Sequence, residues 1–389
     1  MDIFEKCHPP QIVAETRDCG IYPYFHALAS MPGTEVVMEG RRRIMLGSNN
    51  YLGLTSNPEV VEAGMKALEK YGTGCSGSRF LNGTLELHIE LEAELANYLH
   101  TESAVTFSTG FQTNLGIISA IVHQGDYVIC DRENHASIYD GCKLSYGKML
   151  RYRHSDMDDL ENTLKKIPDS AGKLIVTDGV FSMSGDIADL PRITALAEKY
   201  GARIMVDDAH GLGVLGDGGR GTASHFGLES KVDIKMGTFS KSLASLGGYV
   251  AVNADIADYV RHVSRPFIFS ASVTPASCAS ALAALKYLRK HPEIVDRLSA
   301  LSSYARDGLK KRGIPIRESA TPIVPIHTCD AMNTLSKAKE LFDAGVYVNP
   351  VLPPASAPNE CLLRTSYMAT HTEAILDEAM DIVKDVMAT

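Results

Sequence analysis

Several features of exported and membrane-embedded proteins are absent from this chain of 389 residues. No C-x-x-C pair occurs, and the eight cysteines are scattered, so neither a disulfide framework nor a cysteine-based zinc site is expected. The opening MDIFEKCHPP lacks the apolar region of a secretory signal, and no apolar stretch reaches the length of a membrane span. We therefore expect a cytoplasmic protein with reduced thiols.

An excess of positive charge is also absent. The net charge is −9 and the pI is about 5.8, which argues against a broad surface for nucleic acid or anionic membranes. An anionic substrate would need a local basic site instead. With 45% hydrophobic and 22% charged residues, the chain can bury a sizeable core and is long enough for two or three domains.

Short apolar strands alternate with helical patterns from about residue 56. Such a pattern predicts an α/β fold with a mostly parallel sheet covered by helices on both faces. Ligands of these sheets bind beyond the carboxyl ends of the strands. On one helix, Leu85, Ile89, Ala96 and Leu99 are expected to share the buried face. The expected strands are 104–107, 127–130, 173–177, 203–207 and 248–252.

Three regions are expected along the chain. Residues 1–55 combine an arm with two short strands around Glu39-Gly40. Residues 56–288 form the large domain, which ends in a long helix, and residues 289–389 form a smaller α+β domain. The smaller domain is expected to begin with two helical segments that end near Arg312.

The stretch 235–248, KMGTFSKSLASLGG, places Lys241 among small residues. A lysine on such a low-profile backbone can approach a flat ligand closely. Partial desolvation would lower its pKa and make the neutral amine a nucleophile. The local sequence alone also allows an ordinary surface lysine near a turn.

Other polar groups follow the expected strands and can converge with Lys241. Gly110 opens a helix after a strand, where backbone N–H groups and a helix N-terminus suit a phosphate. Asp207 ends an apolar strand, so its buried carboxylate needs a cationic partner such as a protonated ring nitrogen. His135 lies in a polar loop, where a histidine bonded to backbone is the alternative. Hydroxyls at Thr238 and Ser240 add donors for an anion.

Several local alternatives remain open. Asp208 and His210 could begin a metal site, although spacing suggests no third ligand, and the aspartates could instead cap a helix. Asn50 and Tyr51 in SNNYLGL could face a ligand or merely form a turn. The run 211–216 matches G-x-G-x-x-G with Asp233 about 20 residues on, as in a dinucleotide site. No helix is expected to follow it, so close backbone approach is the preferred interpretation.

Together these parts make a site for a phosphate, a pyridinium nitrogen, an aromatic face and an imine-forming lysine, which is a site for pyridoxal 5′-phosphate (PLP). The chain resembles the α-oxoamine synthases, PLP enzymes of fold type I with an aspartate aminotransferase-like fold. These enzymes join an amino acid to an acyl-CoA with decarboxylation. The resemblance covers nearly the whole chain and is carried by DRENHASIYDG, DGVFSMSGD, VDDAHGLGVLGDGGRGT and GTFSKSLASLGG.

The resemblance implies a role for each matching residue. Lys241 would hold PLP and later move the Cα proton, and Arg364 would clamp the substrate carboxylate with its planar fork. Without the family, a structural salt bridge would be an equal explanation for Arg364. Asn50 would face the site across a dimer interface.

The remaining implied residues contact the cofactor. Asp207 would keep the ring nitrogen protonated, making the ring an electron sink. His135 would stack on the ring and help orient the substrate carboxylate, and His210 would bond the 3-oxygen. The other implied contacts are Ser182, a phosphate set of Gly110, Phe111, Thr238 and Ser240, and Ser272 from a neighbouring subunit.

Within the family, stretches such as KYGTGCSGSRFLNGT, FSASVTPAS and VYVNPVLPPA look most like bacterial serine palmitoyltransferases. This resemblance implies condensation of L-serine with palmitoyl-CoA or another long-chain acyl-CoA, giving 3-oxosphinganine, CoA and CO₂, by a homodimer with shared active sites. The alternatives are the siblings 8-amino-7-oxononanoate synthase and 2-amino-3-ketobutyrate CoA ligase. A lipid-like product would allow loose contact with the inner membrane.

Overall fold

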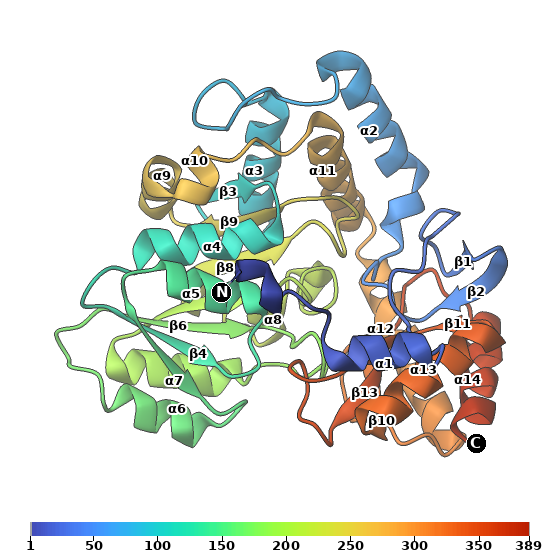
Figure 1. Cartoon of the computed structure of the whole chain (residues 1–389). Coiled ribbons are helices and arrows are strands. Elements are labelled where there is room, and N and C mark those ends of the chain that lie inside the picture. Colours follow the sequence, from blue (N-terminus) through green and yellow to red (C-terminus); the bar gives the residue numbers. More distant parts are fainter. Residues whose placement is uncertain (1, 389) are drawn as a thin grey trace.

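A seven-stranded sheet organises the larger part of the chain in the computed structural model, which describes residues 2–388 (Figure 1). The strand order is β3-β9-β8-β7-β6-β4-β5, and only β9 runs against its neighbours. The mostly parallel sheet expected from the sequence is therefore confirmed. Its strands are β3 (Ser103–Phe107), β4 (Tyr127–Asp131), β5 (Lys148–Tyr152), β6 (Lys173–Asp178), β7 (Arg203–Asp207), β8 (Ile234–Thr238) and β9 (Gly248–Val252).

Helices cover both faces of this sheet because alternate strand residues point to opposite sides. In β9, Val250 packs with the helices of one face, whereas Tyr249 packs with those of the other. The first face carries α4 (Gly110–Ile121), α5 (Ala136–Leu144), α9 (Ala254–Val263) and α10 (Arg265–Ile268). The second carries α3 (Glu86–Tyr98), α6 (Met157–Leu164), α7 (Leu190–Tyr200), α8 (Thr222–His225) and α11 (Pro275–Lys290), with α2 (Pro58–Tyr71) packed on α11.

The five predicted strands are confirmed, but β5 and β8 were not predicted. β5, KMLRY, is a polar edge strand with only Tyr152 buried, so it lacks an apolar run. β8 is fully buried but contains Lys235 and Gly237. Lys235 is tolerated there because its Nζ donates to the carbonyl of Leu99 at 2.7 Å.

The predicted buried face of α3 is wrong at one position. Ile89 is 60% exposed, whereas Leu91 and Leu95 are fully buried. His88 and Glu92 share this buried face because His88 bonds the carbonyl of Val273 at 2.8 Å and Glu92 pairs with an arginine. A pattern of apolar residues alone could not identify a face that includes satisfied polar groups.

Two three-stranded sheets form the smaller part, at the lower right of Figure 1. In the first, β2 pairs in parallel with β11, so the first and last thirds of the chain share a sheet. The second is antiparallel, in the order β10-β13-β12. The strands are β1 (Glu35–Met38), β2 (Arg41–Met45), β10 (Ile323–Cys329), β11 (Val346–Tyr347), β12 (Asn349–Val351) and β13 (Cys361–Ser366). The three-region division of the chain stays a prediction.

Helices α12 (Glu293–Lys311), α13 (Ala331–Ala344) and α14 (Glu373–Met387) complete this part, and α1 (Gln11–Asp18) precedes it. The prediction of two helical segments before Arg312 is wrong, because α12 is continuous. Its Ser302 hydroxyl bonds back to the carbonyl of Leu298 at 2.6 Å and causes no break. Within residues 2–388, no helix is long and apolar enough to cross a membrane.

Candidate active site

A cavity of about 220 Å³ lies at the carboxyl ends of β6, β7 and β8, where the sequence predicts ligand binding. The N-terminus of α4 closes one side. The predicted residues that line it are Gly110, Phe111, His135, Ser182, Asp207, His210, Thr238, Ser240 and Lys241. The lining residues that were not predicted include Asn114, Ser137 and Asp178.

Lys241 lies in the loop that follows β8 and is half-buried. Burial lowers the pKa of its amine to about 8, although the carboxylates of Asp207 and Asp178 act in the opposite direction. The loop packs closely on Gly213, where an added Cβ would lie 2.6 Å from the Cβ of Ser242. The structure thus supplies the desolvated lysine that the sequence suggested, with a substantial neutral fraction near neutral pH.

We expect the reaction of the cofactor-free protein with PLP to accelerate as the pH rises through about 8 and then to level off. The sign follows because only the neutral amine is nucleophilic, and the lowered pKa makes it available below the usual lysine range. Stopped-flow absorbance after mixing with PLP would measure this rate. A midpoint near the ordinary lysine pKa of roughly 10.4 would contradict the assignment.

Asp207 lies at the end of β7, 3% exposed, beside Asp178 on β6. Its carboxylate accepts hydrogen bonds from Asn114 Nδ2 at 2.7 Å and from the backbone N–H of Ala209 at 3.0 Å. Burial, reinforced by Asp207, raises the pKa of Asp178 well above the usual range. Asp207, whose carboxylate is held by hydrogen bonds, is therefore accompanied in the cavity by Asp178, whose carboxyl group favours its neutral form.

Two histidines border the cavity in different ways. His135 caps α5 and opens to the cavity, with its ring edge-on to Phe111 at 6.4 Å between centroids. Although His135 opens to the cavity, the surrounding protein displaces water from part of its ring, and this desolvation lowers its pKa. His210 is buried, and its Nδ1 lies 2.6 Å from the hydroxyl of Tyr51. Burial lowers the pKa of His210 well below its ordinary value, so this ring is neutral.

The α4 end of the cavity is suited to an anion. The first N–H groups of a helix have no partners within the helix, and here they include those of Gly110 and Phe111. The hydroxyl oxygens of Thr238 and Ser240 lie 2.9 Å apart beside this turn. A Cβ at Gly110 would approach Thr238 to 2.8 Å, so the glycine is required for the close packing of these donors.

Arg364, on β13, is 4% exposed and reaches toward this region from the smaller part of the chain. Its Nη2 donates to Asn49 Oδ1 at 3.0 Å and to the Tyr51 hydroxyl at 3.2 Å, and its Nε donates to the Ser182 carbonyl. Among residues 2–388, no carboxylate lies within ion-pairing distance of this guanidinium. The salt-bridge alternative is thereby removed, and a buried cation remains for an anionic ligand.

Asn50 and Ser272 do not line the cavity of this chain. The Asn50 amide donates to the carbonyl of Pro32 and the hydroxyl of Thr55, and Ser272 donates to the Gly77 carbonyl at 3.1 Å. Their predicted roles at a dimer interface stay predictions. Asn49, which the sequence did not single out, contacts Arg364 instead, and only its place in the same polar turn could have suggested it.

The structure accounts for the competing motifs. Both carboxylate oxygens of Asp208 accept from Thr222, at 2.6 Å from its hydroxyl and 2.9 Å from its N–H. Within residues 2–388, no group of three or more potential metal ligands is found. The glycine run 211–216 is followed by a short 3₁₀ turn, Asp217–Gly219, and then by the four-residue α8, instead of the long helix of a dinucleotide site. The run packs on the Lys241 loop, and Asp233 pairs with Arg203 at 2.7 Å.

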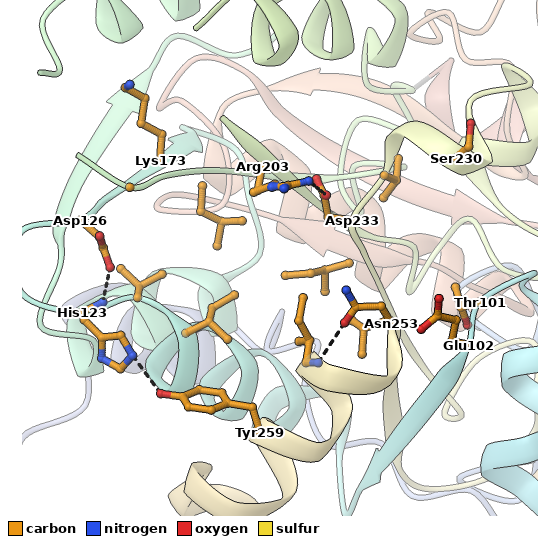
Figure 2. A pocket seen from close by; sticks show the side chains of 18 of the residues that line it. Thr101, Glu102, His123, Asp126, Lys173, Arg203, Ser230, Asp233, Asn253 and Tyr259 are labelled. Carbon is orange, nitrogen blue, oxygen red and sulfur yellow. Dashed lines mark hydrogen bonds and ion pairs between the residues drawn. The ribbon is translucent and has the colours of Figure 1, made fainter. Parts of the chain in front are cut away.

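A second cavity, of about 830 Å³, lies at the opposite edge of the sheet, where Lys173 and Arg203 begin β6 and β7 (Figure 2). Its polar groups largely bond to one another or to nearby backbone, as in the pair of His123 Nε2 and the Tyr259 hydroxyl at 3.0 Å. Although this cavity is larger, its lining includes neither Lys241 nor the buried pair of Asp178 and Asp207. The chemistry therefore belongs to the smaller cavity.

The smaller cavity fits PLP in each part of that molecule. The α4 turn and the two hydroxyls offer donors to a phosphate, and the Asp207 carboxylate lies ready for a protonated ring nitrogen. The Lys241 amine can reach an aldehyde, and the His135 ring opens to the same space. These groups come from separate elements, so their convergence is not a consequence of one local motif.

Comparison with known proteins agrees with this geometry. The family model described as aminotransferase class I and II matches residues 41–383. The chain is 51% identical over 370 residues to serine palmitoyltransferase from Sphingobacterium spiritivorum, covering 95% of this chain and 93% of that protein. It is 41% identical over 373 residues to 8-amino-7-oxononanoate synthase from Thermoanaerobacter pseudethanolicus, covering 96% and 94%.

A solved structure is similarly close. It is a serine palmitoyltransferase variant from S. paucimobilis with a bound PLP–myriocin aldimine, and it is 38% identical to this chain. The TM-score is 0.95, and the match covers 100% of this chain and 99% of the other.

Proposed function

The chain belongs to the class I and II aminotransferase family, and on that premise we propose that it is a PLP-dependent acyltransferase with fold type I. It condenses L-serine with a long-chain acyl-CoA such as palmitoyl-CoA and releases 3-oxosphinganine, CoA and CO₂, the first step of sphingolipid synthesis. The relatives named serine palmitoyltransferase, about half identical over most of the chain, support this reaction. The sibling 8-amino-7-oxononanoate synthases are less similar.

One observation carries the site assignment. Lys241 and Ser182 line the same cavity, and the buried guanidinium of Arg364 donates to the Ser182 carbonyl, so the lysine and the guanidinium lie at the same site. An α-amino acid presents an amine and a carboxylate on one carbon. The pair of a nucleophilic lysine and a bidentate carboxylate donor is complementary to that substrate.

PLP, when bound, supplies an electron sink for the carbanion formed at the amino-acid Cα. The chain contributes position and proton transfer. Lys241 would hold PLP, and its amine would take the proton from the substrate Cα and return a proton after CO₂ leaves. A pKa of about 8 suits both directions of transfer near neutral pH.

The surrounding groups fix the orientation of the reacting bonds. Electron withdrawal is effective only for a bond held perpendicular to the ring, so the grip of Arg364 on the carboxylate selects which bond reacts. Asp207, held by Asn114, would keep the ring nitrogen of bound PLP protonated. His135 would pack on the ring and help orient the substrate carboxylate, and neutral His210 would bond the 3-oxygen.

A homodimer with shared active sites is part of the proposal. Ser272 does not line the cavity of its own chain, and apolar side chains beside the cavity are left uncovered. Phe111 and Leu246 line the cavity and are 43% and 55% exposed, and Phe269, near Ser272, is 77% exposed. A partner subunit that covers them would bring its Ser272 and Asn50 to the site. A cytoplasmic location with loose contact at the inner membrane, through the lipid-like product, is also proposed.

The function is tested by product formation. We expect the PLP-loaded protein to give 3-oxosphinganine from serine and palmitoyl-CoA, detected by mass spectrometry. Glycine, alanine and threonine, each with acetyl-, pimeloyl- or palmitoyl-CoA, are the comparison reactions. Mass detection is preferable to a thiol dye for released CoA, because eight cysteines would add background.

Two outcomes would change the conclusion in a defined way. A product from alanine with pimeloyl-CoA would transfer the function to the 8-amino-7-oxononanoate synthases. A product from glycine with acetyl-CoA would transfer it to the 2-amino-3-ketobutyrate CoA ligases. Either result would leave the cofactor residues unchanged.

A further inference from the structure

The loop of residues 179–188 joins the two parts of the molecule above the site. It leaves β6 at Asp178 and is folded on itself by a bond from the Phe181 N–H to the Asp186 carbonyl at 2.9 Å. At its tip, the carbonyl of Ser182 accepts from Arg364 Nε. The loop is therefore part of the cradle that holds the guanidinium.

A chain of charges anchors the other side of this loop. Asp186 Oδ2 lies 2.8 Å from Arg317 Nη2, and Arg317 belongs to the smaller part of the chain, just before β10. The same oxygen lies 3.3 Å from Nε2 of His154, whose Nδ1 lies 3.0 Å from Asp131 at the end of β4. Asp186 is therefore the carboxylate at which cations from both parts of the molecule meet.

The charge state of this junction is stable around neutral pH. Burial works against the charged form of His154, but its hydrogen bonds to Asp131 and Asp186 raise its pKa to about 10. The hydrogen bond from His154 lowers the pKa of Asp186. Both partners are therefore ionised, and their contact is a charge-assisted hydrogen bond.

Neutral contacts reinforce the attachment to the smaller part. The hydroxyls of Ser319 and Thr321 both donate to the carbonyl of Gly185 at 3.1 Å. Gly185 has a φ of +73°, and an added Cβ would lie 2.6 Å from the Ile323 carbonyl oxygen. Gly185, the residue before Asp186, thus holds the loop against the start of β10.

We propose that Asp186 is a positioning residue for amino-acid binding, which with Arg317 and His154 sets the place of the Ser182 carbonyl and thereby aims the Arg364 guanidinium at the substrate carboxylate. This inference rests on the proposed role of Arg364. It differs from a general stabilising role, because loss of the junction should weaken substrate binding before it affects PLP or the fold.

The test uses the PLP-loaded protein with Asp186→Asn, which keeps the size of the side chain and removes its charge. We expect the dissociation constant for serine, from spectral titration of the bound cofactor, to rise roughly tenfold, as for loss of a charge-assisted contact. PLP content and melting temperature should stay near those of the parent protein. Arg317→Gln should give the same change, and Arg317 is 36% exposed, so the fold should tolerate its replacement.

A double-mutant cycle with Arg364→Lys decides the mechanism. If Asp186 acts through Arg364, adding Asp186→Asn to Arg364→Lys should cause little further loss of serine affinity. An equal loss in both backgrounds would overturn the proposal, as would parallel loss of PLP and serine binding. Asp158→Asn removes a surface partner of Arg192 at 3.1 Å and serves as the matched control.

The experiment also separates this inference from the choice of substrate. If the parent protein binds and converts glycine or alanine instead of serine, the same titrations are made with that amino acid. The proposal that serine is the substrate would then be rejected, whereas the positioning role of Asp186 would still be tested.

Discussion

The Lys241→Ala protein is expected to lose turnover by at least about 10³-fold, because the lysine is proposed to act both in covalent binding of the cofactor and in proton transfer. Borohydride reduction followed by peptide mapping should attach PLP to Lys241 in the parent protein and to no peptide in the variant. Product formation, measured by mass spectrometry, should fall in parallel.

Lys231→Ala is the matched control for this experiment. Lys231 is an exposed lysine just before β8 that pairs with Glu198, so its loss should leave both the label and the turnover intact. Steady-state turnover that survives in Lys241→Ala would reject the assignment of the catalytic lysine. Label on a different lysine in the parent protein would reject the assignment of the cofactor attachment.

The second large effect is expected at Arg364. Truncating one partner of a buried, hydrogen-bonded charge pair costs about 2–5 kcal/mol, which corresponds to roughly 30-fold or more in affinity. Arg364→Ala should therefore raise the dissociation constant for serine by about 10²-fold or more. Arg364→Lys should recover only part of the loss, because an ammonium lacks the planar fork that matches a carboxylate.

The comparison with PLP affinity gives this prediction its specificity. The residues proposed to bind PLP lie on elements other than β13, so PLP content should be retained in both Arg364 variants. Arg312→Ala removes an arginine of the same part of the molecule, paired with Asp377 and Asp381, and should leave serine affinity unchanged. Equal loss of PLP and serine affinity in Arg364→Ala would contradict the role of a carboxylate clamp.

Much of this site could be predicted because its residues end buried strands. Asp207 follows an apolar run and Gly110 begins a helix after one, so each was identifiable from its position along the chain. Asp178 ends β6 in the same way as Asp207 ends β7, and the same signal could have found it. Knowledge of the family supplied the roles of Arg364 and His210, because the residues alone left His210 as a possible metal ligand and Arg364 as a possible salt-bridge partner.

Other features depend on partners that are distant in sequence. Lys235 and Glu92 are buried charges that break the apolar patterns of β8 and α3. Each contacts a group far along the chain, the carbonyl of Leu99 for Lys235 and the guanidinium of Arg261 for Glu92. The bond from Arg364 to Ser182 spans 182 residues. Such pairs have no local pattern, so only the folded chain shows which polar residues are structural and which remain available to a ligand.

The pairing of β2 with β11 has a consequence for protein synthesis. Ile44 lies opposite Val346, so the first strands must wait for about three hundred further residues to be translated. The seven-stranded sheet is complete at Val252, which allows the lysine cavity to form on the ribosome while the small sheet still lacks its third strand. Arg364 is translated later still. The proposed carboxylate clamp is thus acquired last, and chains that stop early would carry the cavity lysine without it, together with an open strand edge that can pair with other chains.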